Sequence, residues 1–257
     1  MTSPVASIRD VAMRFGGILA LDGVSFDIGP EQIVGLIGPN GAGKTTLFNC
    51  LSRLYTPTSG DILLHGRSLL GRPAYSIAAL GIGRTFQNLA LFPKLSVADN
   101  IKVGGHAEIA GDFISDALRL PRARAGAREL DRRVGAIVDE LELGALAQRL
   151  VGDLPFGTQK RVELARALAT NPSLLLLDEP AAGLNHEEVD ELGGVIRRIR
   201  DGRRISILLV EHHMGLVMSL SDHVVALNFG RKIAEGTPLK VQADEAVAAA
   251  YLGGTAQ

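Results

Sequence analysis

The sequence is poor in cysteine and in net charge, and each shortage excludes a class of protein. A single cysteine among 257 residues, Cys50, excludes an internal disulfide and a zinc site built from several cysteines. It fits a reducing compartment, and we expect Cys50 to act as a small buried apolar residue. The formal net charge of −1 lacks the basic excess of most nucleic-acid binders. We therefore expect no nucleic-acid partner.

The sequence also lacks long apolar segments. Its N-terminus has no basic stretch followed by an apolar one, so we expect no signal peptide. No apolar run approaches the roughly 18 residues that a membrane-spanning helix needs. We therefore expect any connection to a membrane to come through a partner. Hydrophobic residues at 46% and charged residues at 21% are typical of a globular protein and argue against disorder.

The most informative stretch is Gly-Pro-Asn-Gly-Ala-Gly-Lys-Thr-Thr at residues 38–46. Its spacing fits the phosphate-binding P-loop, in which glycines let backbone N–H groups approach a phosphate. Lys44 would lie along the β- and γ-phosphates, and the Thr45 hydroxyl would bind Mg²⁺. The apolar segment 33–37 predicts a buried strand before the loop, and 45–52 predicts a helix after it. The stretch predicts a nucleoside triphosphate site, and an incidental glycine-rich turn is the alternative.

Acidic residues end a second apolar segment. Four leucines followed by Asp178 and Glu179 predict a buried parallel strand whose carboxyl end lies at a polar site. Asp178 would hold Mg²⁺ through water, and Glu179 would polarise a water molecule that attacks the γ-phosphate. The alternative is a pair of solvated acids after an ordinary strand. Another buried strand is predicted at 205–210, and His212 at its end could donate to a phosphate oxygen or be structural.

The other segments predict the elements around these motifs. Strands are expected at 5–15, 24–28, 61–64 and 82–87, and helices at 73–80, 157–169 and 187–200. After residue 87 the pattern becomes helical, with apolar helical spacing over 134–146 and an arginine-rich segment at 119–133 that we interpret as a solvated helix face. We therefore predict a nucleotide-binding core formed by residues 1–87 and 157–257, with a helical subdomain inserted at 88–156.

Together these motifs resemble the nucleotide-binding subunit of an ATP-binding cassette (ABC) transporter. Within that family the chain most resembles the ATP-binding subunits of branched-chain amino acid importers and their relatives. The resemblance covers nearly the whole chain, through segments 13–17, 37–49, 84–87, 162–168, 176–185, 210–212 and 251–253. The first and last of these carry the subfamily assignment. The resemblance implies an α/β fold, a P-loop NTPase core with a parallel sheet, an N-terminal antiparallel β-subdomain and an inserted helical subdomain.

The same resemblance implies roles for single residues. Phe15, which by itself would be assigned to core packing, matches the aromatic residue that stacks on adenine. Gln87 matches the glutamine that touches Mg²⁺ and water while reporting to the membrane subunit. Asp178 matches the magnesium-site aspartate, Glu179 the general base and His212 the histidine at the γ-phosphate.

The expected site residues form three sets with ATP and Mg²⁺ as ligands. The nucleotide-binding set is Phe15, Asn40, Gly41, Ala42, Gly43, Lys44, Thr45 and Thr46. The catalytic set is Lys44, Gln87, Glu179 and His212, and the metal set is Thr45, Gln87 and Asp178. Residues 181–185 match the loop that crosses the dimer. Asn185 and His213 both stand where relatives usually have Asp.

The largest departure from the family pattern is in the signature motif. Where the family usually has Leu-Ser-Gly-Gly-Gln, this chain has Leu154, Pro155, Phe156, Gly157 and Thr158. Gly157 and the following helix N-terminus keep a backbone donor and a helix dipole. The serine hydroxyl that would bond a γ-phosphate is lost, and proline also lacks an N–H.

The predicted function is ATP binding and hydrolysis that energises an importer. The sequence does not distinguish among branched-chain amino acids, urea, amides and aromatic acids as the imported solute. The expected first partner is a second ATPase subunit, a paralogue with an intact signature, which forms a head-to-tail dimer with this chain. Transmembrane permease subunits would bind the dimer at the cytoplasmic face of the membrane. A solute-binding protein would act indirectly through the permease. Residues 89–100, with Leu91, Phe92 and Leu95, would receive a permease helix or else pack on their own subdomain.

Two other functions stay open at this stage. One is a non-transport ABC ATPase that remodels DNA or ribosomes, although such proteins usually fuse two cassettes or carry coiled-coil or zinc insertions. The other is a degenerate cassette that binds ATP without turnover, and the presence of Glu179 and His212 argues against it.

Overall fold

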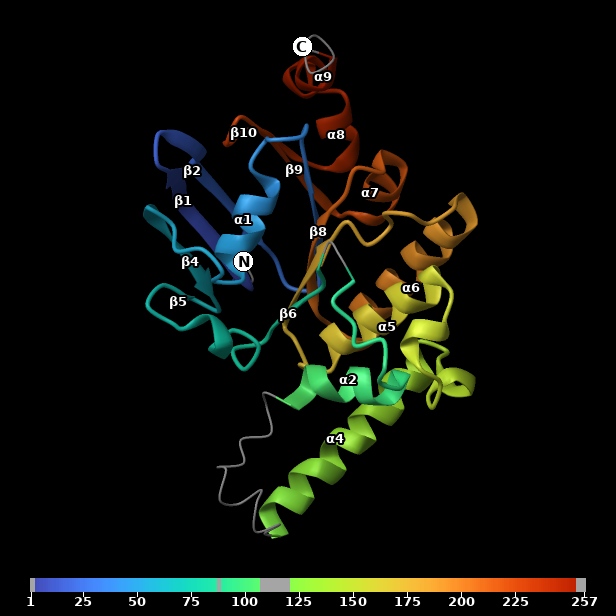
Figure 1. Cartoon of the computed structure of the whole chain (residues 1–257). Coiled ribbons are helices and arrows are strands. Elements are labelled where there is room, and N and C mark those ends of the chain that lie inside the picture. Colours follow the sequence, from blue (N-terminus) through green and yellow to red (C-terminus); the bar gives the residue numbers. More distant parts are fainter. Residues whose placement is uncertain (1–2, 87–88, 107–120, 253–257) are drawn as a thin grey trace. The chain divides into compact units, whose positions relative to one another are not determined.

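The computed structural model describes residues 3–86, 89–106 and 121–252 (Figure 1). The chain divides into two compact units, one formed by residues 1–77 and 173–257 and the other by residues 78–172. These limits differ from the predicted insertion at 88–156. Helix α5 (Phe156–Leu168) lies in the second unit because it packs against α2 (Val97–Gly105). The two backbones are so close that a Cβ on Gly104 would lie 2.0 Å from the Arg166 carbonyl oxygen.

The first unit begins with an antiparallel sheet in the order β2-β1-β4-β5. Its strands are β1 (Ala6–Phe15), β2 (Ile18–Ile28), β4 (Ser59–Leu64) and β5 (Arg67–Ser68). Strand β2 starts six residues before the predicted 24–28, since Ile18 pairs with Phe15 across a turn at Gly16 and Gly17. The strand pairing continues to this end although side chains there are exposed, with Ile18 72% accessible.

The second sheet of this unit is mainly parallel and contains the buried strands. Its order is β10-β9-β3-β8-β7, where only the β9–β10 pair is antiparallel. The strands are β3 (Ile33–Ile37), β7 (Leu174–Asp178), β8 (Ser206–Val210), β9 (His223–Asn228) and β10 (Arg231–Gly236). Every residue of β3, β7 and β8 is buried, as continuous apolar runs in a parallel sheet require.

The helices of the first unit follow the strands of this sheet. They are α1 (Lys44–Leu51), α6 (His186–Arg203), α7 (Met214–Leu220), α8 (Pro238–Gln242) and α9 (Glu245–Leu252), with a 3₁₀ turn at Ala74–Ser76. Cys50 on α1 is fully buried, and burial raises the pKa of its thiol to about 11. The expectation that Cys50 is a buried apolar residue is confirmed.

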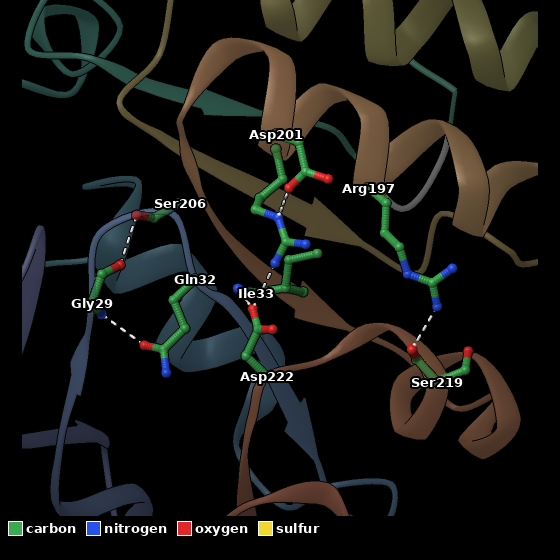
Figure 2. A network of polar contacts seen from close by, with 9 residues as sticks. Gly29, Gln32, Ile33, Arg197, Asp201, Ser206, Ser219 and Asp222 are labelled. Carbon is green, nitrogen blue, oxygen red and sulfur yellow. Dashed lines mark hydrogen bonds and ion pairs between the residues drawn. The ribbon is translucent and has the colours of Figure 1, made fainter.

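At the amino ends of the parallel strands, polar groups bond to one another (Figure 2). The Ser206 hydroxyl donates to the Gly29 carbonyl oxygen at 2.7 Å. The Asp222 carboxylate accepts from the Ile33 amide at 2.8 Å and from the Arg200 guanidinium at 2.9 Å. These bonds attach the segment before β9 to the start of β3 and to α6, and they attach the start of β8 to the segment before β3.

The second unit is largely helical. It contains the strand β6 (Ile82–Arg84), α2, α4 (Pro121–Glu140), 3₁₀ turns at Gly144–Leu146 and Val151–Asp153, and α5. Among the described residues of the chain, no helix has the length and apolar character that crossing a membrane requires.

Three predicted elements are shorter in the structure. The predicted helix at 134–146 ends at Glu140, because Glu142 takes a left-handed φ of 57° and the chain turns into a 3₁₀ segment. The predicted helix at 73–80 is only the 3₁₀ turn at Ala74–Ser76. The strand predicted at 82–87 ends at Arg84, and Gln87 lies outside the described residues.

Candidate nucleotide-binding and catalytic site

The glycine-rich loop connects β3 directly to α1, and its shape depends on two glycines. Gly38 has a φ of 150°, and an added Cβ would lie 2.2 Å from the Leu227 carbonyl oxygen. Gly43 has a φ of 103°, and an added Cβ would lie 2.7 Å from the Ala20 carbonyl oxygen. Neither position has room for a side chain. The strand–loop–helix arrangement predicted for residues 33–52 is thus present, with α1 one residue earlier than expected.

Lys44 lies inside this loop. Its side chain is 6% exposed, and its Nζ donates to the carbonyl oxygens of Gly38 at 2.7 Å and Pro39 at 3.0 Å. Burial lowers the pKa of Lys44, although the nearby charges of Glu179 and Asp178 act in the opposite direction. A cation with both loop carbonyls and two carboxylates around it is suited to neutralising an anionic ligand.

Asp178 and Glu179 follow the leucines of β7, as predicted. Asp178 is the last residue of the strand and is 2% exposed. Glu179 takes a left-handed φ of 47°, and its amide donates to the Val210 carbonyl oxygen at 2.8 Å. This backbone turn brings the carboxylate to the carboxyl end of the neighbouring strand β8.

The structure brings Glu179 and His212 together, although 32 residues of sequence lie between them. Glu179 Oε1 and His212 Nε2 are 2.9 Å apart, with the side chains 18% and 42% exposed. Adjacent parallel strands end at the same sheet edge, so residues that follow β7 and β8 meet there. An acid held by an imidazole at such an edge can accept a proton from water.

Sequence reasoning gave no role to Glu211, which organises the same region. Its side chain is 3% exposed, and its carboxylate accepts from the amides of Ala181 at 2.7 Å, His212 at 2.9 Å and His213 at 3.2 Å. One carboxylate therefore connects the loop after β7 to the loop after β8. The signal available in the sequence was an acid directly after five buried strand residues, since a buried charge needs hydrogen-bond partners.

Asn185 and His213, at which the resemblance implies Asp, are both helix caps. Asn185 caps α6 by accepting from the Glu188 amide at 3.0 Å, and the Glu188 carboxylate accepts from the Asn185 amide at 2.9 Å. His213 caps α7, with Nδ1 accepting from the Leu216 amide at 3.2 Å. Both side chains supply the acceptor that a helix N-terminus requires.

Phe15, the predicted adenine-stacking residue, ends β1 and is 41% exposed. Its ring lies 5.2 Å from the Tyr55 ring at an interplanar angle of 75°, an edge-to-face contact. The side chain is therefore half-buried by a second aromatic ring and still presents surface to solvent.

In the second unit, residues 154–158 form the start of α5. Leu154 is buried, Pro155 occupies the N-cap position without a side-chain cap, and Phe156 is 46% exposed. The Gln159 side chain donates to the Leu154 carbonyl oxygen at 2.8 Å. Gly157 and Thr158 lie in the first turn, so the helix N-terminus expected there is present.

Residues on both sides of the segment 87–88 are attached to α5. The Glu163 carboxylate accepts from the Phe86 amide at 3.1 Å, and the Arg166 guanidinium donates to the Ala90 carbonyl oxygen. Glu163 is 2% exposed, and burial raises the pKa of its carboxyl group. Gln87, predicted to touch Mg²⁺ and water, lies outside the described residues.

The donor set at the first unit's site fits a magnesium-bound nucleotide. Gly41 is exposed, and an added Cβ there would meet no atom within 4 Å, so the loop backbone is open at this residue. The exposed Thr45 hydroxyl and the Asp178 carboxylate are hard oxygen ligands of the kind that Mg²⁺ prefers. No group of three or more His, Cys, Asp and Glu side chains suited to a metal occurs in the described part of the chain.

A phosphate loop, a strand ending in two acids and a histidine beside the second acid define a P-loop ATPase of the ATP-binding cassette class. Comparison with known proteins agrees with this class. The family model described as "ABC transporter" matches residues 21–182, and that described as "Branched-chain amino acid ATP-binding cassette transporter" matches residues 231–257.

Two curated relatives cover almost the whole chain. The high-affinity branched-chain amino acid transport ATP-binding proteins BraF of Pseudomonas aeruginosa and LivG of Escherichia coli are each 42% identical over 98% of this chain and 99% of their own length. A nucleotide-free ATP-binding cassette from an ABC transporter has a TM-score of 0.84 at 27% identity, covering 97% of this chain and 99% of that one. The chain belongs to the ABC transporter family of ATP-binding proteins.

Proposed function

We propose that this chain is the subunit that binds and hydrolyses ATP to drive import of branched-chain amino acids or a closely related small solute. The observation that carries the proposal is the 2.9 Å contact between Glu179 and His212 beside the buried Lys44. The names of the 42% identical relatives and the C-terminal family segment support the solute class. A cassette that binds ATP without turnover is less well supported, because it has no need for this acid–imidazole pair.

Each site residue has a proposed role. Lys44 exchanges its loop carbonyl partners for the β- and γ-phosphates, while Thr45 and Asp178 hold Mg²⁺. When bound, this ion neutralises charge on the phosphate oxygens. Glu179 accepts a proton from the attacking water, and His212 orients Glu179 and donates to a phosphate oxygen.

Three further assignments complete the proposed site. The exposed face of Phe15 stacks on adenine, and Tyr55 supports the ring from the side. The loop residues Asn40 to Gly43 and Thr46 surround the phosphates. Gln87 remains the proposed contact to Mg²⁺, water and the membrane subunit.

Reconstituted transport tests the function. The subunit would be combined in proteoliposomes with its permease and solute-binding protein, and ATP-driven uptake of labelled leucine would be measured. We expect uptake with the wild type and at least about a 10²-fold loss with Glu179→Gln. Competition by urea, amides and aromatic acids identifies the solute. ATP hydrolysis without uptake of any of these solutes would contradict the proposed transport function.

The proposed permease contact is the segment 89–100 of the second unit. Phe92 and Leu95 are 48% and 37% exposed, whereas Asn100 is buried and bonds the Phe92 backbone at 2.8 and 3.0 Å. A segment with a fixed backbone and exposed apolar side chains is suited to receiving a helix. Phe92→Glu should lower uptake while leaving ATP binding by the isolated subunit intact, and unchanged uptake would remove this assignment.

Pro155 suggests that the physiological dimer pairs this chain with a paralogue that has a serine in its signature. In a head-to-tail dimer each signature faces the partner's nucleotide, so a homodimer would lack the serine hydrogen bond at both sites. Such a bond to a charged phosphate contributes roughly 1.5–3 kcal/mol, or about tenfold or more in closure. We expect the mixed dimer to turn over ATP faster than this subunit alone, and Pro155→Ser to raise the rate of the lone subunit. Equal rates in all three preparations would exclude the asymmetric dimer.

A further inference from the structure

The C-terminal helix α9 is hydrogen-bonded to the phosphate loop through the Tyr251 hydroxyl. Tyr251 Oη accepts from the Gly38 amide at 2.9 Å. The same oxygen lies 4.0 Å from Met214 Sδ, and Met214 is the first residue of α7, two residues after His212. The tyrosine therefore touches the beginning of the phosphate loop and the helix that follows the catalytic histidine.

The Tyr251 ring is held in this position by apolar packing. It lies against a buried cluster formed by Ile37, Val217, Val224, Ala226, Val241 and Val247. Ile37 is the residue before Gly38, and Val217 lies on α7. Because the ring packs against these elements, the core sets the direction of the hydroxyl.

Both polar backbone groups of Gly38 are bonded to side chains, one of them the Tyr251 hydroxyl. The residue is buried, and the Leu227 carbonyl oxygen occupies the side on which a Cβ would project. Its amide is satisfied by Tyr251 and its carbonyl oxygen by Lys44 at 2.7 Å. Tyr251 and Lys44 thus bind the amide and the carbonyl oxygen of the same glycine. Lys44 is also the residue proposed to contact the phosphates.

Elsewhere the loop and α9 are less closely packed. A pocket lies between them, lined by Pro39, Asn40, Gly41 and Ala42 of the loop, by Ala249 and Ala250 of α9, and by Asn228 and Phe229 of the β9–β10 turn. Removing the hydroxyl would leave the buried Gly38 amide without its partner, and the pocket beside residues 39–42 gives the following part of the loop space to move.

We propose that Tyr251 is a positioning residue of the nucleotide site, whose hydroxyl holds Gly38 and, through it, the loop and Lys44 in the conformation that receives ATP. The inference rests on the proposed function, because it assigns a part of ATP binding to the C-terminal segment. This role makes the C-terminal helix α9 a structural component of the nucleotide-binding site.

The test compares Tyr251→Phe with wild type in the full-length chain, using calorimetric titration with MgATP. The substitution removes one oxygen and keeps the ring, so we expect the dissociation constant to rise about five- to tenfold. The matched control is Tyr75→Phe in the same unit, whose side chain is 84% exposed and whose hydroxyl loss should leave affinity unchanged.

Two further measurements separate positioning from mere packing. The KM for ATP should rise by the same factor while kcat stays within about twofold, since Tyr251 does not touch the reacting atoms. The Gly38 amide should exchange with solvent faster in Tyr251→Phe in the absence of nucleotide. A lower melting temperature with unchanged affinity would assign Tyr251 to stability alone and overturn the inference.

The outcomes also distinguish this inference from the function on which it rests. If the wild type binds MgATP and Tyr251→Phe binds it equally well, only the role of Tyr251 is wrong. If the wild type fails to bind MgATP, the proposed function fails, and the positioning role fails with it.

Discussion

The two ends of the parallel strands in the first unit carry similar polar residues but use them differently. At the amino ends, the Asp222 carboxylate, the Arg200 guanidinium and the Ser206 hydroxyl bond to strand backbone or to one another (Figure 2). Gln32 accepts from the Gly29 amide at 2.8 Å in the same region. Each group has a partner within the fold, so this end stabilises the sheet.

At the carboxyl ends, charged groups gather around a loop that is shaped for a ligand. Lys44 is buried between loop carbonyls, and the Glu179–His212 pair lies where β7 and β8 end. Burial lowers the pKa of Lys44, which means that the fold gives up part of the favourable hydration of this cation. The comparison shows that the kinds of charged residue present do not distinguish the ligand-binding end of the strands from the structural end. The arrangement of those charges around accessible backbone does distinguish them.

The strongest way to test this difference is to remove the charge at the carboxyl end. Lys44→Ala should lower ATP affinity and turnover by at least about 100-fold, because a charge-assisted contact to phosphate is lost. The free energy of unfolding should change by only about 1 kcal/mol, since a desolvated cation is removed along with its hydrogen bonds. Nucleotide titration and urea denaturation measure the two effects, with the exposed Lys240→Ala as control. A large fall in the free energy of unfolding with unchanged ATP affinity would reverse the comparison.

The second test separates chemistry from binding at the same end. Glu179→Gln keeps the size of the side chain and removes its basicity, so turnover should fall by about 10²-fold or more while ATP affinity is retained. Steady-state hydrolysis and equilibrium binding give the two numbers. The control is Glu187→Gln at an exposed position of α6, which should hydrolyse ATP at the parent rate. A Glu179→Gln protein as fast as its parent would refute the general-base role.

The third test moves to the amino end. Asp222→Ala removes the acceptor of the buried Ile33 amide and the partner of Arg200, and should lower the free energy of unfolding by about 1–3 kcal/mol. ATP affinity at saturating magnesium should stay within about twofold. The control is Asp201→Ala, which removes only an ion pair of Arg200 and whose side chain is 64% exposed. Comparing the denaturation of the two variants separates the contribution of the Ile33 backbone bond from that of the Arg200 ion pairs. A large change in ATP affinity would show that the two ends are coupled.

The smallest effect is expected at the edge of the amino-end network. Arg197 is exposed and donates to the Ser219 carbonyl oxygen at 2.6 Å (Figure 2). Because water can replace the guanidinium at an exposed carbonyl, Arg197→Ala should cost about 0.5 kcal/mol or less in the free energy of unfolding. A loss as large as that of Asp222→Ala would mean that the whole network is cooperative.

Local patterns predicted the elements around the site well. The strand at 33–37 is present with the same limits, and the leucine run ending in Asp178 is the buried strand β7. Such segments are decided by short apolar runs and glycine spacing, which a single sequence displays. The helix at 134–146 was predicted too long because apolar spacing continues after the helix has ended, and Leu141 and Leu143 are buried through a turn instead.

Other residues could not be assigned from local patterns. The strands and helices after His213 were not predicted from sequence patterns. They are α7, β9, β10, α8 and α9, which complete the sheet and the helices packed with it. Glu211 and His213 carry backbone bonds that depend on neighbouring loops and a helix start. A carboxylate or an imidazole has the same appearance in a sequence whether it caps a helix, joins two loops or performs catalysis.

The sequence by itself determined that this chain binds a nucleotide, because the residues of the phosphate loop are consecutive and each has one physical reason to be there. It also determined the family, through motifs that are specific in combination. Only the tertiary structure decided which side chains act on one another. Glu179 meets His212 because two strands distant in sequence are neighbours in the sheet, and Tyr251 reaches Gly38 across 213 residues because the core orients its ring. Hydrogen bonds depend on distance and direction in space, and neither is written in the order of the residues.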